Sequence, residues 1–112
     1  MKMIVAIIRP DRLQQVREAL GRMNIPGLTA IEGRGMGNQE GYRERYRGLE
    51  CNVDMFVKTR VEIAVLDEQA DEIVEAVRKA AYTGEIGDGK IFVVPLEESI
   101  RVRTGETGKA AV

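Results

Sequence analysis

Residues 57–65 alternate strictly between two kinds of side chain, and no other feature constrains the fold as strongly. In an extended strand, one face of this segment would carry apolar side chains and Thr59, and the other would carry Lys58, Arg60 and Glu62. We therefore predict a half-buried strand with a core on one side and a charged reverse.

Three further segments have strand character. Residues 3–8 are apolar without alternation, which is typical of a central strand covered on both faces. Residues 28–36 read as a second strand, although Gly33 and Gly35 leave part of one face bare. A fourth strand is predicted at residues 91–94, after the second helix. A short final strand is expected around residues 101–103.

Apolar residues at helical spacing indicate two helices. Pro10 and Asp11 open the first, whose stripe runs to Met23, and the second runs from Asp67, a plausible N-cap, to Ala81. The order is then β-α-β, a long loop at 37–55, and β-α-β. This order predicts one α+β domain over residues 1–112 with the ferredoxin-like arrangement, an antiparallel sheet with both helices on one face. The open face would pack on another subunit, so we expect a homo-oligomer.

Composition excludes several classes of function. The 17 Lys and Arg against 18 Asp and Glu give a net charge of −1, which offers no overall attraction to nucleic acid. The chain has no His and a single cysteine, Cys51, so a Cys and His zinc cage is excluded and a reducing cytoplasm is expected. The apolar run Met3 to Ile8 is too short for a signal peptide or a membrane span, which predicts a soluble, unexported protein.

A glycine-rich stretch at residues 83–90 carries the sharpest chemical signal. Gly84 and Gly89-Lys90 match the G-x-x-x-x-G-K part of a phosphate-binding loop, in which backbone N–H groups approach phosphate oxygens and lysine supplies charge. Ile91 stands where a Walker loop needs Ser or Thr for magnesium, which argues against a P-loop NTPase. The alternative is a simple glycine-rich helix stop and turn.

Other charged residues extend this signal. On an extended segment, Arg101 and Arg103 would point the same way and, with Lys90, form a cationic group suited to a triphosphate. The alternative is two solvated arginines in a polar tail. Lys58 and Glu62 could contact an acidic metabolite and an exocyclic amine, or simply face solvent. No catalytic constellation is present, so binding rather than turnover is expected.

Four stretches resemble the PII signal-transduction family, over nearly the whole chain. They are the opening at 3–10, Tyr46-Arg47-Gly48, the run 83–93 and the ending 100–106. The resemblance implies a ferredoxin-like subunit in a compact homotrimer that holds ATP or ADP in each intersubunit cleft. It also implies three named segments: a T-loop at 37–55, a phosphate-binding B-loop at 82–90, and a C-terminal strand and C-loop at 101–112.

The resemblance also assigns residues by position. For the nucleotide it implies Thr29, Gly35, Gly37, Asn38, Glu62, Ala64, Gly87, Asp88, Gly89, Lys90, Arg101 and Arg103. For 2-oxoglutarate, with Mg held partly by Gln39, it implies Gln39, Glu40, Gly41 and Lys58. For a partner such as an ammonium channel it implies the loop tip Tyr46, Arg47 and Gly48.

Departures from the family pattern narrow the expected regulation. Cys51 replaces the tyrosine that many members modify, and Leu49 replaces a serine phosphorylated in some members, so neither modification is expected. Asn38 and Glu40 stand where Arg and Lys are common, and Glu40 brings negative charge near the 2-oxoglutarate site.

These features predict a cytoplasmic regulator of nitrogen metabolism that meets a membrane only through a channel partner. The alternatives are a nitrogenase-associated paralogue acting on an enzyme, a ferredoxin-like RNA-binding module and a small nucleotide-processing enzyme. The RNA alternative is disfavoured because the chain has only five aromatic residues.

Overall fold

The computed structural model describes residues 1–25, 27–36, 42–46, 49–53 and 55–112. The elements in chain order are β1 (Lys2–Ile8), the 3-10 helix η1 (Pro10–Arg12), α1 (Leu13–Arg22), β2 (Thr29–Gly35), β3 (Tyr42–Tyr46), β4 (Leu49–Val53), β5 (Phe56–Val65), α2 (Asp67–Ala81), β6 (Gly89–Pro95) and the 3-10 helix η2 (Gly108–Ala111).

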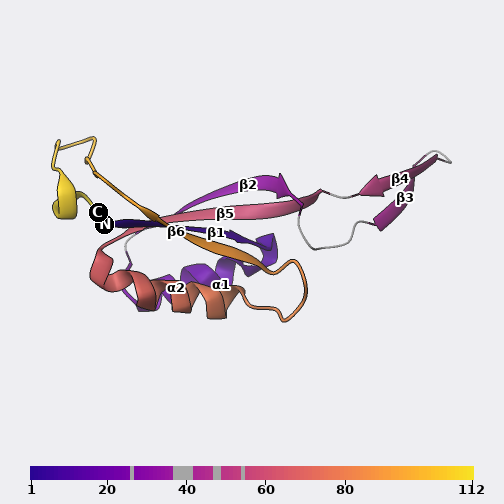
Figure 1. The fold of residues 1–112 in the computed structure, drawn as a ribbon, viewed down its shortest axis with the longest axis horizontal. Helices are drawn as coiled ribbons and strands as arrows, with labels where there is room; N and C mark the ends of the chain where they lie inside the picture. The colour runs from indigo at the N-terminus through magenta and orange to yellow at the C-terminus, as the bar shows by residue number, and fades with distance from the viewer. Residues whose placement is uncertain (26, 37–41, 47–48, 54) are drawn as a thin grey trace.

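Four strands form the main sheet in the order β2-β5-β1-β6, and every neighbouring pair is antiparallel. Strand β1 lies centrally, with Ile4 opposite Ile63 of β5 and Val93 of β6. Both helices cover the same face of the sheet (Figure 1). This arrangement confirms the ferredoxin-like prediction, and it leaves the other sheet face, called here the open face, without a helix.

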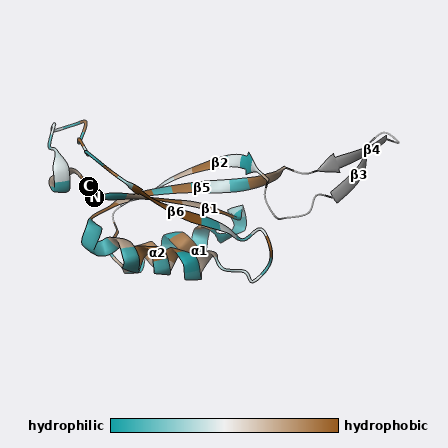
Figure 2. Cartoon of the chain, viewed as in Figure 1, coloured by the Kyte–Doolittle hydropathy of each residue, from teal (hydrophilic) through white to brown (hydrophobic). Residues whose placement is uncertain are grey.

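The core lies between the helices and the sheet. Its fully buried side chains come from β1, β5 and both helices, namely Ile4, Ile8, Val16, Val61, Ile63, Val65, Ile73 and Val77. Figure 2 shows apolar residues along the strands and mixed hydropathy along both helices, as expected for helices with one face on a core. On the open face Val5 is also buried, so the central strand has burial on both sides.

The helix ends are fixed by polar contacts. The side chain of Arg12 donates through Nε and a terminal nitrogen to the carbonyl of Ala80, at 3.1 and 2.8 Å, which ties η1 to the end of α2. Helix α2 begins one residue earlier than predicted, because Leu66 rather than Asp67 occupies the N-cap position and Asp67 is the first helical residue. The Asp67 carboxylate accepts from the Met1 ammonium group at 2.8 Å. None of the helices in the described residues is long and apolar enough to cross a membrane.

Two sequence predictions are corrected. The segment 37–55 was expected to lack regular structure, but it contains an antiparallel pair, β3 and β4, in which Tyr42 pairs with Val53 and Tyr46 with Leu49. The alternation at Leu49–Val53 is a strand signal, but it spans only five residues in a segment rich in Arg, Glu and Gly. Figure 1 shows this pair beyond the ends of β2 and β5, far from the chain termini.

The expected strand at 101–103 is wrong. Residues 102–104 form a turn, closed by the Gly105 N–H donating to the Arg101 carbonyl at 2.8 Å, and only an isolated bridge links Ile100 and Thr107. Gly105 has a φ of 73°, which a glycine adopts without steric cost. Arg101 and Arg103 are therefore not side by side on an extended segment.

Candidate functional site

The predicted site residues on the main sheet and on the loop before β6 fall into two groups. Gly35, Lys58, Gly87, Asp88, Gly89 and Lys90 form what we call the loop-end group, and Thr29, Glu62 and Ala64 form the tail-end group. Strand β5 belongs to both, and Lys58 lies four residues from Glu62, about 14 Å along the strand. The two groups thus lie toward opposite ends of the same sheet face.

The loop-end group surrounds a cavity of about 550 Å³. All six of its residues line this cavity, together with Ile7, Met36, Ile86 and Phe92. Lys90 is exposed and makes no hydrogen bond or ion pair with any residue that the structure describes. Its ammonium group is therefore available to an incoming anion.

The loop that leads into β6 is shaped by its own polar groups. The Thr83 N–H donates to the Asp88 carboxylate at 3.3 Å, and the Glu85 N–H donates to the Thr83 hydroxyl at 3.1 Å. Gly87 and Gly89 have φ values of 96° and 122°. A Cβ at position 89 would lie 1.9 Å from the carbonyl oxygen of Ile7, so the close approach of the two strands requires glycine there.

Two cations hold this loop, Lys58 of β5 and Arg9, which directly follows β1. Lys58 Nζ donates to the Gly87 carbonyl at 2.7 Å, and a terminal nitrogen of Arg9 donates to the Ile86 carbonyl at 2.9 Å. Burial lowers the pKa of Lys58, the charge of Arg9 lowers it further, and Asp88 acts in the opposite direction. A carboxylate or phosphate near Lys58 would offset this loss of solvation.

The tail-end group lines a second cavity of about 600 Å³. Its walls also include Lys109 and Val112 from the end of the chain. Glu62 is partly buried and lies 3.8 Å from Arg60, and it is opposite Thr29 in the β2–β5 register. This cavity offers a carboxylate and a threonine beside apolar side chains, a setting that suits a flat, mostly apolar group with a polar edge.

Arg101 and Arg103 follow the Pro95 end of β6, whereas Lys90 lies near the start of that strand. Figure 1 shows the tail after β6 beside both termini and the loop before β6 at the opposite end of this strand. The predicted cationic group of Lys90, Arg101 and Arg103 is therefore not formed within one chain. Arg101 donates a hydrogen bond to the Ala110 carbonyl and forms an ion pair with Glu106. Arg103 is exposed and makes no hydrogen bond or ion pair with the described residues. The sequence analysis grouped these three cations because a sequence does not show how far apart its residues lie in the folded chain.

Several predicted residues lie outside the described part of the chain. They are Gly37, Asn38, Gln39, Glu40, Gly41, Arg47 and Gly48. Tyr46 is the last residue of β3 and pairs with Leu49. Within the described residues, there is no group of three or more His, Cys, Asp or Glu side chains that could hold a metal ion.

Arg9, Lys109 and Val112 were missed by the sequence analysis. Arg9 directly follows the buried strand β1, and its role depends on a contact with Ile86, 77 residues away. Lys109 and Val112 reach the tail-end cavity only because the chain turns back after residue 104. No local pattern signals contacts of this range.

The comparisons with known proteins agree with this fold and sequence. The family model described as nitrogen regulatory protein P-II matches residues 1–106. The chain is 50% identical to nitrogen regulatory protein GlnK of Escherichia coli (strain K12) and 52% identical to nitrogen regulatory protein P-II of Rhizobium meliloti (strain 1021), each over 112 residues and the full length of both proteins.

A solved structure is also similar. It is the crystal structure of Arabidopsis thaliana PII bound to citrate, with 39% sequence identity and a TM-score of 0.81, covering 99% of this chain and 91% of that one. The match of family, sequence and fold extends over almost the whole chain. The chain therefore belongs to the P-II family of nitrogen regulatory proteins and is a signalling protein rather than an enzyme.

Proposed function

We propose that this chain forms a homotrimer that binds ATP or ADP in clefts between subunits and passes the nucleotide state to nitrogen-metabolism partners. Each cleft joins the loop-end group of one subunit to the tail-end group, Arg101 and Arg103 of its neighbour. The loop-end group, which includes Lys90, binds the phosphates, and the tail-end group binds the adenine.

The separation of the cations carries this proposal. Lys90 lies near the start of β6 and the two arginines follow the other end of that strand, so we place both at one triphosphate only across two chains. Head-to-tail contacts of this kind close into rings, and a three-membered ring would complete every half-site.

The open face supplies the surface for such an assembly. Ile31, Phe92 and Val94 are 50%, 50% and 45% exposed in the single chain. From the sheet register, all three lie on the open face with Val5 and Ile7. Apolar side chains of this size on a helix-free sheet face favour burial against another copy.

The loop-end cavity also suits an acidic effector. Lys58 sits in a poorly solvated position, and the similar Arabidopsis thaliana protein was crystallised with citrate, a carboxylate. We propose 2-oxoglutarate as the effector. Magnesium would be held by Gln39 together with the effector, with Glu40 and Gly41 alongside. A bound metal would supply positive charge against the negative charges of nucleotide and effector.

The segment 37–55 is the proposed contact with partners. The β3–β4 pair stands beyond the main sheet, and Tyr46 is the last residue of β3. Arg47 and Gly48 follow it in the sequence. We propose an ammonium channel or a nitrogen-metabolism enzyme as the partner, with the protein in the cytoplasm and at the membrane only through such a channel.

Subunit mixing tests the divided site. Lys90→Ala and Arg103→Ala are each expected to weaken ATP binding by roughly 10- to 150-fold, the loss of a charge-assisted phosphate contact worth ~1.5–3 kcal/mol. When the two variants are coexpressed, about a quarter of the clefts in randomly mixed rings would combine two intact halves. Isothermal titration calorimetry should then recover about that fraction of wild-type sites.

Lys79→Ala serves as the matched control, because Lys79 is exposed on α2 and its ion pair with Glu75 is long, at 4.0 Å. It should bind ATP like the wild type. A mixed sample with no restored sites would mean that both halves belong to one chain. A wild-type protein that sediments as a monomer, or ignores both nucleotides, would overturn the whole proposal.

A further inference from the structure

We infer that Glu106 sets the affinity of the phosphate site, because its carboxylate competes with an incoming phosphate for the guanidinium of Arg101. This inference rests on the proposed nucleotide function and adds a residue that limits it.

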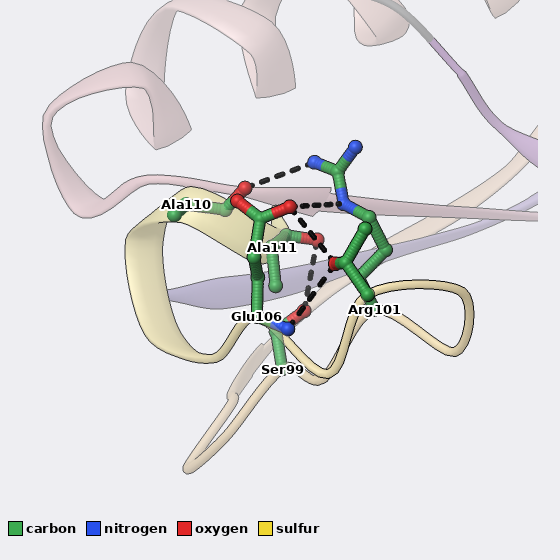
Figure 3. Close-up of polar contacts among 6 residues, drawn as sticks. Ser99, Arg101, Glu106, Ala110 and Ala111 are labelled. Atoms are coloured by element: carbon green, nitrogen blue, oxygen red, sulfur yellow. Dashed lines mark hydrogen bonds and ion pairs between the residues drawn. The ribbon is translucent and has the colours of Figure 1, made fainter.

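The contacts of Arg101 carry the argument. Its Nε lies 3.7 Å from the Glu106 carboxylate, and a terminal nitrogen donates to the Ala110 carbonyl at 2.9 Å. Figure 3 shows both acceptors beside the guanidinium, with dashed lines from it to Ala110 and to Glu106. Both side chains of the ion pair are about half exposed, so a solvent-borne anion can reach the same guanidinium.

The carboxylate is held in this place by its own surroundings. The Thr104 hydroxyl donates to the oxygen of Glu106 that faces Arg101, at 2.8 Å, and the Glu106 N–H donates back to that hydroxyl at 3.2 Å. The Arg101 N–H donates to the Glu106 carbonyl at 2.8 Å, which fixes the two residues opposite each other. Glu106 is thus kept beside Arg101 by the backbone as well as by charge.

Arg103 provides the internal comparison. It is two residues away on the same turn, yet it makes no hydrogen bond or ion pair within the described part of the chain. An anion therefore meets a fully available charge at Arg103 and a partly neutralised one at Arg101. A phosphate beside Arg101 also lies near the negative charge of Glu106, which opposes binding.

The competition also involves the end of the chain. A phosphate that draws Arg101 away releases the Ala110 carbonyl, and the adjoining Lys109 and Val112 line the tail-end cavity where we place the adenine. Occupation of the phosphate position and packing of the tail around the base are then linked through one guanidinium.

The test compares two substitutions with the same change in charge. Glu106→Gln removes the competitor, whereas Glu97→Gln removes an exposed carboxylate from the same segment that makes no hydrogen bond or ion pair with a described residue. In calorimetric titrations with ATP, we expect Glu106→Gln to lower the Kd by about 2- to 5-fold, the value of an exposed ion pair. Glu97→Gln should leave the Kd unchanged, and added salt should shrink the difference.

The outcomes separate this inference from the proposed function. If wild-type protein binds no nucleotide, the proposed function itself fails. If wild type binds but Glu106→Gln binds equally or more weakly, Glu106 does not compete with phosphate. Urea unfolding checks that the variant folds, and Thr104→Val, which removes the hydroxyl that holds Glu106, provides a second variant expected to tighten binding in the same direction by less.

Discussion

The loop at 83–90 and the tail at 99–112 are both glycine-containing segments at the ends of β6, but they are held in different ways. The loop is fixed by backbone sterics at Gly89 and by the partly buried cation Lys58. The tail is held by exposed polar contacts such as Arg101 with Glu106. The comparison teaches that one end of the proposed site is preformed, whereas the other can rearrange at low cost.

The largest effect should follow from Gly89→Ala. Its Cβ would lie 1.9 Å from the Ile7 carbonyl oxygen at a φ of 122°, so β6 must separate from β1. We expect a loss of about 3–5 kcal/mol in the free energy of unfolding, because backbone strain and a steric clash add. Urea denaturation followed by circular dichroism measures it.

Gly105→Ala in the tail is the matched substitution. Its φ of 73° also favours glycine, but a Cβ there meets nothing within 4 Å. The expected loss is about 1 kcal/mol, the conformational penalty alone. Equal losses for the two variants would break the distinction between a sterically fixed loop and an adaptable tail.

The next effect concerns the cations that hold the loop. Lys58→Met removes the donor to the Gly87 carbonyl and should cost about 1–2 kcal/mol locally. Hydrogen exchange should show faster exchange of the amides at 84–88, with little change in α1. Arg60→Met is the control on the same strand and face, since Arg60 is half exposed and its pair with Glu62 is 3.8 Å long. Unchanged exchange in Lys58→Met would show that sterics alone hold the loop.

The smallest effect lies at Asp67, beside the chain termini. The Met1 ammonium group, chiefly through its hydrogen bond, holds the pKa of this carboxyl below its ordinary value of 3.8. A lowered folded pKa contributes stability that is present above 3.8 and is lost as the pH falls through the folded value. At pH 6 the unfolding midpoint of the wild type should therefore be slightly higher than that of Asp67→Asn. The difference between the two midpoints should disappear at low pH. A gap that persists at low pH would assign the effect to something other than this ion pair.

Periodicity predicted most of the fold. The alternation at 57–65 and the helical stripes are local patterns, and they correctly gave the four main strands, both helices and the ferredoxin-like order. The glycine at 89 was singled out as a phosphate-loop residue, and the structure adds a steric reason for it.

What could not be predicted depends on contacts between distant residues or on single turns. The β3–β4 pair consists of two five-residue strands in a segment rich in Arg, Glu and Gly, and the turn at 102–104 depends on Gly105, which an extended reading of Arg101 and Arg103 overlooked. The distance between Lys90 and Arg101 follows from the whole length of β6, so spacing in the sequence suggested one cluster where the chain has two.

The bidentate contact from Arg12 to the Ala80 carbonyl has a mechanical consequence for the neighbouring loop. It secures the chain just before the loop starts, and Gly89 locks it where the loop ends, so both ends of this span are fixed. A span tethered at both ends cannot swing outward like a hinged flap, and its motion is restricted to breathing of the middle residues. For the proposed nucleotide site, a loop held at both ends is a fixed wall rather than a lid.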